Sequence, residues 1–250
     1  MALLALLAST TVAAELVGGV DLPTFASGVP TFASGETPCL FHCGPVVHTD
    51  DGPVQGRHDG AVTVYHGIPF AAPPTGARRF AAPERPAAWN ATKQATKHHS
   101  CPQLDLVKGL TLGHEDCMYL SVYVPSSCTP EAPCPVMQWI HGGAWIIGSN
   151  YEFSKYDATT LAQTYGVVVV AANYRLDSLG WLAVDELTDA DGAFGNYGLQ
   201  DQRFAMQWTQ RNAKQFGGDP HRVTIFGESA GGFSVCQVSY GDANVCTGIE

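Results

Sequence analysis

One segment restricts the fold of this chain more than any other. The short apolar run Val223–Phe226 leads directly into Gly227-Glu228-Ser229-Ala230-Gly231-Gly232, and an apolar segment with helical character follows. A buried strand, a G-x-S-x-G turn and a helix, in this order, form a nucleophile elbow, where a serine stands on a tight turn. Small residues on both sides of the serine relieve the crowding in that turn. The segment therefore predicts Ser229 as a nucleophile at the end of a strand in an α/β fold.

The rest of the chain alternates in the same way. Three further segments have the pattern of strands, and the last opens with the continuous β-branched run expected of a strand buried on both faces: 119–124, 135–140 and 167–173. Two segments have the pattern of helices, with Gly166 and Gly217-Gly218 as their C-terminal stops: 156–165 and 199–216. This alternation predicts a mostly parallel sheet with flanking helices.

A second glycine-containing segment supports the prediction for Ser229. His141-Gly142-Gly143-Ala144-Trp145 follows the predicted strand at 135–140 and precedes the nucleophile in the chain. An ester carbonyl under attack becomes an oxyanion, which needs preorganised hydrogen-bond donors. Gly142 and Gly143 are predicted to supply two backbone N–H groups and Ala230 a third. An ordinary Gly-Gly turn is the alternative, but the chain order and the preceding strand favour an oxyanion hole.

Several ordered segments resemble the type-B carboxylesterases, the family that includes cholinesterases, bile-salt-type lipases and fungal lipases. The resemblance runs from about Gly67 to Cys236 and rests on these segments: Gly67-Ile68-Pro69-Phe70-Ala71 with Pro73-Pro74 and Arg79-Phe80, Glu115-Asp116-Cys117-Met118-Tyr119-Leu120, Asn173-Tyr174-Arg175-Leu176, Gly195-Asn196-Tyr197-Gly198-Leu199-Gln200-Asp201-Gln202, and Phe216-Gly217-Gly218-Asp219-Pro220. It implies the α/β-hydrolase fold and hydrolysis of carboxylic esters by a Ser–Glu/Asp–His triad through an acyl-enzyme. It also implies a disulfide between Cys101 and Cys117, and it places His141 in the oxyanion segment and not in the triad. No cofactor or metal is expected, because side chains and water are the attacking groups.

The predicted triad is incomplete in this sequence. The fold places the acid and then the histidine after the nucleophile, and the residues after Ser229 include Asp242 and Glu250 but no histidine. We therefore expect a fragment, truncated after the nucleophile elbow, that is inactive as it stands and has an open apolar sheet edge. The family resemblance fades from Val238, where Val-Ser is what a common splice donor encodes. This suggests intron read-through or a partial gene model.

The beginning of the chain predicts secretion. Met1–Ala14 is a short apolar run ending in small residues, typical of a signal peptide and too short to span a bilayer. A disordered apolar start is the alternative. Residues 15–44 are interpreted as a flexible leader containing a near-duplicated heptapeptide, and 45–250 as the N-terminal part of the hydrolase domain. Asn90 begins a glycosylation sequon, so a secreted, extracellular glycoprotein is expected.

The eight cysteines also fit an oxidising compartment. The pairs Cys39/Cys43 and Cys128/Cys134 are close in sequence, but spacing alone leaves the pairing of these cysteines open. A metal site is the competing interpretation, yet no C-x-x-C pair is present and His98-His99 is expected in a solvated loop. His221 precedes the last predicted strand at the end opposite the elbow, so it is expected on the surface.

Charge and composition exclude some function classes. The formal net charge of -10, without a basic cluster, argues against nucleic acid and against anionic membrane surfaces. No later segment has the length and apolarity of a membrane helix. A small-molecule or lipid ester is the expected substrate, and the sequence leaves the oligomeric state open.

Two alternatives to a general esterase or lipase remain. The resembled family includes non-catalytic adhesion modules that lost the nucleophile, whereas Ser229 and the Gly142-Gly143 pair are intact here. In the resembled family, members that bind choline have an aromatic residue in the loop before the Glu-Asp-Cys segment, which makes a cation–π contact. Here the segment between Cys101 and Cys117 contains no aromatic residue, which argues against choline specificity. Trp145 and Trp181 could line an acyl pocket, although core packing is the favoured role for both.

Overall fold

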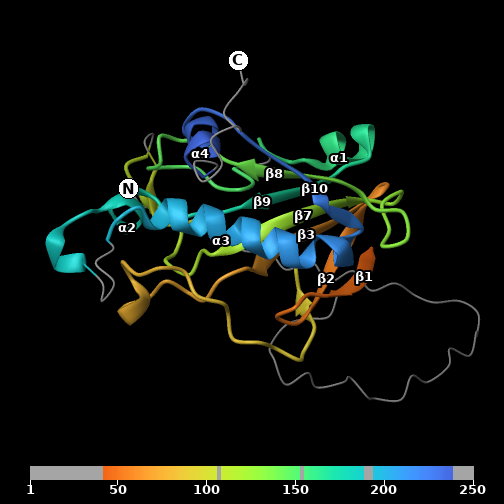
Figure 1. The fold of residues 1–250 in the computed structure, drawn as a ribbon, viewed down its shortest axis with the longest axis horizontal. Coiled ribbons are helices and arrows are strands. Elements are labelled where there is room, and N and C mark those ends of the chain that lie inside the picture. The colour runs from red at the N-terminus through yellow and green to blue at the C-terminus, as the bar shows by residue number, and fades with distance from the viewer. Residues whose placement is uncertain (1–41, 106–107, 153–154, 189–193, 239–250) are drawn as a thin grey trace, which may run out of the picture. The chain divides into compact units, whose positions relative to one another are not determined.

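The computed structural model describes residues 42–105, 108–152, 155–188 and 194–238. The predicted signal peptide, most of the predicted leader and Cys39 lie outside these residues. In the described part, an eight-stranded mixed sheet has the order β1-β2-β3-β7-β9-β8-β10, with β4 paired to β2 (Figure 1). Its strands are β1 (Cys43–His48), β2 (Pro53–Asp59), β3 (Val62–Pro69), β4 (Lys93–Gln94), β7 (Tyr119–Pro125), β8 (Cys134–Ile140), β9 (Val168–Ala172) and β10 (Gly218–Gly227).

The sheet has two halves that differ in strand direction. In the sheet order, each of the strands β1, β2, β3, β7 and β9 is antiparallel to the next. Strands β9, β8 and β10 are parallel to one another. The prediction of a mostly parallel sheet is therefore correct only for the second half. For β1, β2 and β3 the reason lies in the short connections, because antiparallel neighbours need only a tight hairpin, whereas parallel neighbours need a crossover. Strands β2 and β3 are joined through Gly60, at φ 59°, and Ala61.

The crossovers of the parallel half are helical. The helices of the described part are α1 (Thr159–Tyr165), α2 (Asp177–Trp181), α3 (Tyr197–Asn212) and α4 (Ala230–Val238), with short 3-10 turns η1 (Gly76–Arg78), η2 (Asp185–Leu187) and η3 (Ala213–Phe216). Gly166, at a left-handed φ of 59°, ends α1 as predicted. The helix predicted over 199–216 is instead α3 followed by the 3-10 turn η3, which ends at Gly217 with a φ of 70°. Helix α1 starts later than expected, and β10 starts earlier, because Gly218 already pairs with Cys134 of β8.

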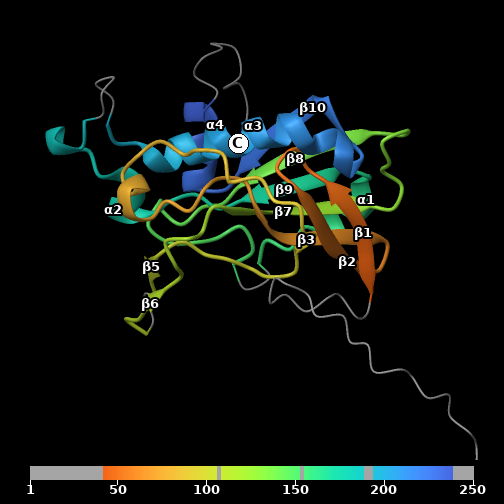
Figure 2. The ribbon, with the colours of Figure 1, turned by 90° about the horizontal axis from the view of Figure 1, so that it is seen from below.

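The two faces of the sheet bury separate apolar clusters. On the α3 face, Trp208 and Ala205 are fully buried against side chains that include Tyr65 and Val170. On the opposite face, Ala162 of α1 packs with Tyr123 and its neighbours. Figure 2 shows α3 and α4 on the same side of the strands. The small ribbon of β5 (Gln103–Leu104) and β6 (Thr111–Leu112) lies away from these helices. These layers hold the carboxyl ends of β8, β9 and β10 in fixed positions.

A buried ion pair joins the end of β9 to α3. The guanidinium of Arg175 donates to both carboxylate oxygens of Asp201, at 2.8 and 2.7 Å, and the backbone N–H of Arg175 donates to the same carboxylate at 3.0 Å. Both side chains are almost completely buried. A buried charge needs a partner of this kind, since an unpaired one would carry a large desolvation cost.

The last strand lies at an edge. Among the described residues β10 has β8 as its strand neighbour, and its Ile225 and Phe226 are half-buried. The expectation of an open apolar sheet edge stays a prediction.

Candidate active site

Ser229 stands on the sharp turn that the sequence predicts. Strand β10 ends at Gly227 and α4 begins at Ala230, so Glu228 and Ser229 alone connect them. Ser229 has a φ of 54°, in the left-handed region that non-glycine residues rarely adopt. Two hydrogen bonds close the turn, from the N–H of Gly231 to the Glu228 carbonyl at 2.9 Å and from the N–H of Phe233 to the Ser229 carbonyl at 3.0 Å. The serine itself is exposed. This is the geometry of a nucleophile elbow.

The glycines of the elbow are required by backbone contact. A Cβ on Gly227 would lie 2.5 Å from the carbonyl carbon of Gly231. A Cβ on Gly231 would overlap the Ile140 carbonyl oxygen and lie 2.8 Å from the His141 carbonyl oxygen. The start of α4 therefore packs directly on the backbone at the end of β8, and no side chain fits between them.

The predicted oxyanion segment lies against Ser229. A Cβ on Gly142 would be 3.2 Å from Ser229 Cβ and 2.7 Å from the Glu228 carbonyl oxygen. Gly143, Ala144 and Trp145 then turn the chain with φ values of 107°, 53° and 60°. The turn is closed by the N–H groups of Ile146 and Ile147, which both donate to the Gly143 carbonyl at 3.0 Å. The structure thus brings Gly142 and Ser229 together, as the sequence analysis expected.

Several backbone N–H groups near Ser229 are available as hydrogen-bond donors. Within the ranges that the structure describes, the N–H groups of Gly142, Gly143 and Ala230 have no acceptor. The same is true of Ala144, which the sequence analysis did not include. Backbone donors without a partner beside a nucleophile suit a developing oxyanion, and the N-terminus of α4 adds a favourable dipole. The assignment of individual amides as oxyanion donors stays a prediction.

His141 is held inside the fold. Its ring is buried, stacks on Tyr174 with centroids 4.2 Å apart, and its Nδ1 donates to the Gly142 carbonyl at 2.8 Å. The Tyr174 hydroxyl in turn donates to the His141 carbonyl at 2.7 Å. Burial lowers the pKa of His141 to about 4, so the ring is neutral. These contacts agree with a place in the oxyanion segment and give the ring no role as a base for Ser229.

The other histidines named from the sequence lie away from the elbow. His221 is exposed in the first half of β10, far from the carboxyl end of the strand. His98 is exposed and His99 half-buried, with the His99 ring stacked on Tyr119 at 3.7 Å. Within the described ranges, no group of three or more histidine, cysteine, aspartate or glutamate side chains could hold a metal ion. No helix of these ranges is long and apolar enough to cross a membrane.

Glu228, the charged residue before Ser229, has no role predicted from the sequence. Glu228 is exposed, and its Oε2 accepts a hydrogen bond of 3.4 Å from the Tyr156 hydroxyl. A Cβ on Gly142 would lie 2.5 Å from the same oxygen. The carboxylate thus lies over the oxyanion segment. Its place inside G-x-S-x-G was visible in the sequence, but its contact with Tyr156 depends on the folded chain.

Comparison with known proteins fits this geometry. Residues 44–244 match the Carboxylesterase family. The chain belongs to the carboxylesterase family.

The relatives of this carboxylesterase chain are enzymes of similar sequence and greater length. It is 42% identical to the para-nitrobenzyl esterase of Bacillus subtilis (strain 168), over 76% of this chain and 39% of that protein. It is 43% identical to the cocaine esterase of Homo sapiens, over 84% of this chain and 37% of that protein. A solved structure of a thermophilic PNB esterase superposes with a TM-score of 0.70 at 41% identity, over 76% of this chain and 40% of that one. The fold is therefore the α/β-hydrolase fold. It spans about two fifths of the length of these relatives.

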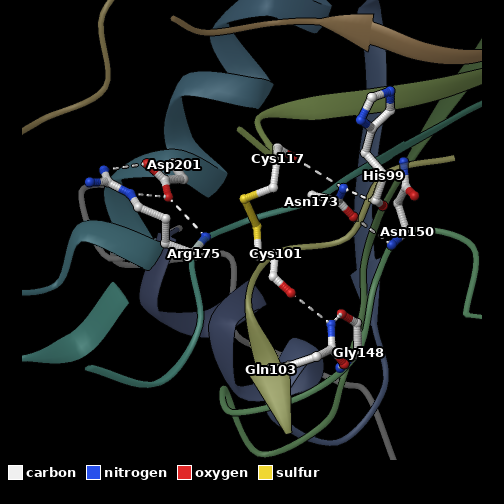
Figure 3. Close-up of a disulfide and its surroundings, with 9 residues drawn as sticks. All are labelled: His99, Cys101, Gln103, Cys117, Gly148, Asn150, Asn173, Arg175 and Asp201. Atoms are coloured by element: carbon white, nitrogen blue, oxygen red, sulfur yellow. Dashed lines mark hydrogen bonds and ion pairs between the residues drawn. A yellow bond between two sulfur atoms is a disulfide. The ribbon is translucent and has the colours of Figure 1, made fainter. Parts of the chain in front are cut away.

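The disulfide implied by the resemblance is present in this carboxylesterase chain. Cys101 pairs with Cys117 across a sequence separation of 16, and both cysteines are buried. Cys128 pairs with Cys134, a pairing that the sequence analysis left open. The first disulfide closes the segment that precedes β7, and Figure 3 shows it near Gln103 and Gly148.

A mostly apolar cavity opens beside the oxyanion segment. It has a volume of about 350 Å³, and its lining combines the apolar side chains of Ala144, Trp145, Ile146, Trp181 and Leu182 with Asp177 and Ser178. The Trp145 indole donates to Ser234 of α4 at 3.0 Å and also packs on the buried cluster around Ile140. The two tryptophans therefore contribute to core packing, as favoured from the sequence, and also face an open cavity.

Proposed function

We propose that this chain carries the nucleophile and the oxyanion donors of a serine carboxylic ester hydrolase, of the carboxylesterase or lipase type, that acts through an acyl-enzyme on Ser229. The observation that carries the proposal is the strained φ of Ser229 at the end of β10, with Gly142 packed against its Cβ. A strained nucleophile beside unpartnered amides is an arrangement that a merely structural turn would not need.

The chemistry follows from these positions. Ser229 Oγ attacks the ester carbonyl, and the negative charge that develops on the carbonyl oxygen is stabilised by N–H groups of the oxyanion segment and of Ala230. The alcohol leaves, the acyl group stays on Oγ, and water then releases the acid. The apolar side chains that line most of the cavity beside Trp145 would accept an uncharged part of the substrate.

A base is the missing component. No histidine of the described ranges hydrogen-bonds to Ser229 Oγ, and a serine hydroxyl without a positioned base is a poor nucleophile. We therefore expect no turnover from the described residues alone. In a longer form, a downstream acid and histidine would complete the triad in the order that the fold uses.

Intact-mass labelling with a fluorophosphonate, together with hydrolysis of a para-nitrophenyl ester, tests the proposal. Both the sequence as given and the longest protein product of the same gene should be assayed. The longer product should hydrolyse the ester and carry one adduct on Ser229, and Ser229→Ala should abolish both. Ser178→Ala is the matched control, because Ser178 is an exposed serine on α2 beside the same cavity. Hydrolysis that survives Ser229→Ala would contradict the proposal.

The same experiment addresses the alternative of a non-catalytic binding module. The intact serine and the adjacent Gly142-Gly143 pair favour the enzyme. If the native protein ended at Glu250 and formed no adduct, the binding module would become the better reading.

Secretion is a further part of the proposal. The two disulfides support an oxidising compartment, and Asn90 is exposed as a glycan acceptor must be. Expression in secretory cells should give a mature protein that starts after Ala14 and loses mass on treatment with a glycosidase, whereas Asn90→Gln should not. Retention in the cell with Met1 intact would contradict it.

A further inference from the structure

The amide side chain of Gln103 joins the disulfide-bonded segment to the oxyanion segment. Its Nε2 donates to the Gly148 carbonyl at 2.8 Å and to the Cys101 carbonyl at 3.1 Å, and its Oε1 accepts the Gly148 N–H at 2.8 Å (Figure 3). One side chain thus satisfies both polar groups of a backbone residue that is 45 positions away. A glutamine amide is suited to this task because it offers a donor and an acceptor side by side.

Gly148 lies in the loop 146–150 that follows the oxyanion segment, where the chain packs back on Gly142 and His141. It has a φ of 108°, and a Cβ at this position would be 2.6 Å from the Gly142 carbonyl oxygen and 2.7 Å from the Nδ1 atom of His141. Gly148 is therefore packed on one side of Gly142, whose other side packs on Ser229. The contacts form a continuous path from Gln103 through Gly148 and Gly142 to the nucleophile.

The side-chain amide of Asn173 fixes the end of the loop that follows the oxyanion segment, at Asn150. The buried Asn150 donates its N–H to Oδ1 of Asn173 at 2.8 Å, and Nδ2 of Asn173 donates to the carbonyls of His99 and Cys117 at 2.8 and 3.1 Å (Figure 3). The disulfide-bonded segment is thereby connected to the oxyanion segment through two side chains. Of these, Gln103 is half-buried and lies on the short ribbon β5, so it can be replaced with little effect on the main sheet.

We infer that Gln103 is a positioning residue of the oxyanion hole, which holds Gly148, and through it the run Gly142–Ala144, at the distance from Ser229 that catalysis needs. Its catalytic meaning rests on the proposed function. Oxyanion donors act within narrow tolerances, because a displacement of about 1 Å can lower a rate by about a hundredfold. Loss of the Gln103 amide would free the segment to shift by such an amount.

Hydrogen exchange tests the mechanical part on the full chain, whether or not it turns over an ester. The informative amides are those of Ile146 and Ile147, which donate to Gly143 and not to Gln103. Gln103→Ala should speed their exchange by about tenfold, because the turn that they close opens more often. Leu104→Ala is the matched control, since Leu104 is the next residue on the same ribbon and its side chain is 51% exposed. Faster exchange at Gly148 alone, with Ile146 and Ile147 unchanged, would overturn the inference.

Gln103→Glu provides a second test that a general loss of folding cannot imitate. The ionised carboxylate still accepts the Gly148 N–H but faces two carbonyl oxygens without a donor. Protonation restores the donor, so the protection of Ile146 and Ile147, corrected for intrinsic exchange, should rise in this variant as the pH falls below about 5. The wild type and Leu104→Ala should show no such rise. A variant without pH-dependent recovery would also overturn the inference.

Kinetics then separate positioning from the proposed function. In an ester-hydrolysing form of the protein, Gln103→Ala should lower kcat by about 10- to 100-fold and leave KM within about twofold, because the amide acts on the transition state. An unchanged kcat would refute the positioning role while the esterase assignment stood. If exchange responded as expected but no form hydrolysed esters through Ser229, the proposed function would fail and the mechanical link would remain.

Discussion

Gly231→Ala should destabilise this protein although alanine is the better helix former. In the first turn of α4 alanine should gain about 0.5–1 kcal/mol over glycine. At Gly231, however, the new Cβ would overlap the Ile140 carbonyl oxygen and lie 2.8 Å from the His141 carbonyl oxygen. Ile140 cannot yield alone, because it is paired with both neighbouring strands of the sheet. The helix would have to move away from β8, and overpacking of this kind costs about 1–3 kcal/mol.

Gly232→Ala is the control that isolates the clash. The nearest atom to its new Cβ is the Gly227 carbonyl oxygen at 3.4 Å, an ordinary contact. Both variants gain the same helix propensity, so the difference between them measures the cost of the contact with β8. Since that contact is with backbone, we expect about 3 kcal/mol, or about 6–12 °C in Tm for a chain of this size. Thermal unfolding followed by circular dichroism, with disulfides intact, gives the comparison. A Gly231→Ala variant that melts at or above the temperature of Gly232→Ala would refute the reasoning.

Three further predictions concern stability. Serine at both positions of the Cys101–Cys117 disulfide should lower the free energy of unfolding by about 3 kcal/mol, and the same change in the shorter Cys128–Cys134 loop by about 2 kcal/mol, both measured by urea unfolding; equal losses would speak against a loop-closure origin. The pKa of His141 is lowered to about 4 in the folded protein, so the neutral ring favours the folded state fully above pH 6.5, and this stabilisation is lost as the pH falls toward 4. The fall in the free energy of unfolding between pH 7 and pH 5 should therefore be about 2 kcal/mol smaller in His141→Phe than in the wild type. The same fall in both proteins would contradict this. Asp201→Asn leaves the buried guanidinium of Arg175 without its counter-charge and should cost about 3–5 kcal/mol in the same urea assay, whereas a loss below about 1 kcal/mol would show that the pair is unimportant.

Local signals in the sequence were sufficient for the parallel half of the sheet. The valine run before Asn173 and the glycines at 166 and 217 predict β9, α1 and η3 because strand burial and left-handed stops depend on few neighbours. In the antiparallel half the alternating segment 119–124 predicted β7, but β1 and β2 gave no such signal. Strand β2 contains a glycine and charged residues, and its burial comes from pairing with β1 and β3. The early start of β10 likewise depends on a partner in β8.

The candidate site shows the same division. Ser229 and its flanking glycines were identified because every requirement of the elbow lies within a few residues of chain. Gln103 and Asn173 were not identified as site residues, since each acts on a backbone group far away in the sequence. Asn173 lies in a segment that carried the family resemblance, yet its two carbonyl partners are visible only in the folded chain.

The close packing of backbone segments around the oxyanion segment explains both its glycines and the side-chain amides that contact it. Gly142 and Gly231 are glycines because backbone segments meet there without room for a Cβ. Such a requirement is visible in the sequence as a glycine. Where the backbone at Gly148 meets no other strand, its polar groups must be satisfied by a side chain, and any residue of the right length and chemistry within reach could serve. A glutamine in a short ribbon has no local pattern that predicts this. Residues that position the oxyanion segment are therefore found by asking which side chain satisfies each backbone group of the segment, and at Gly148 the answer is Gln103.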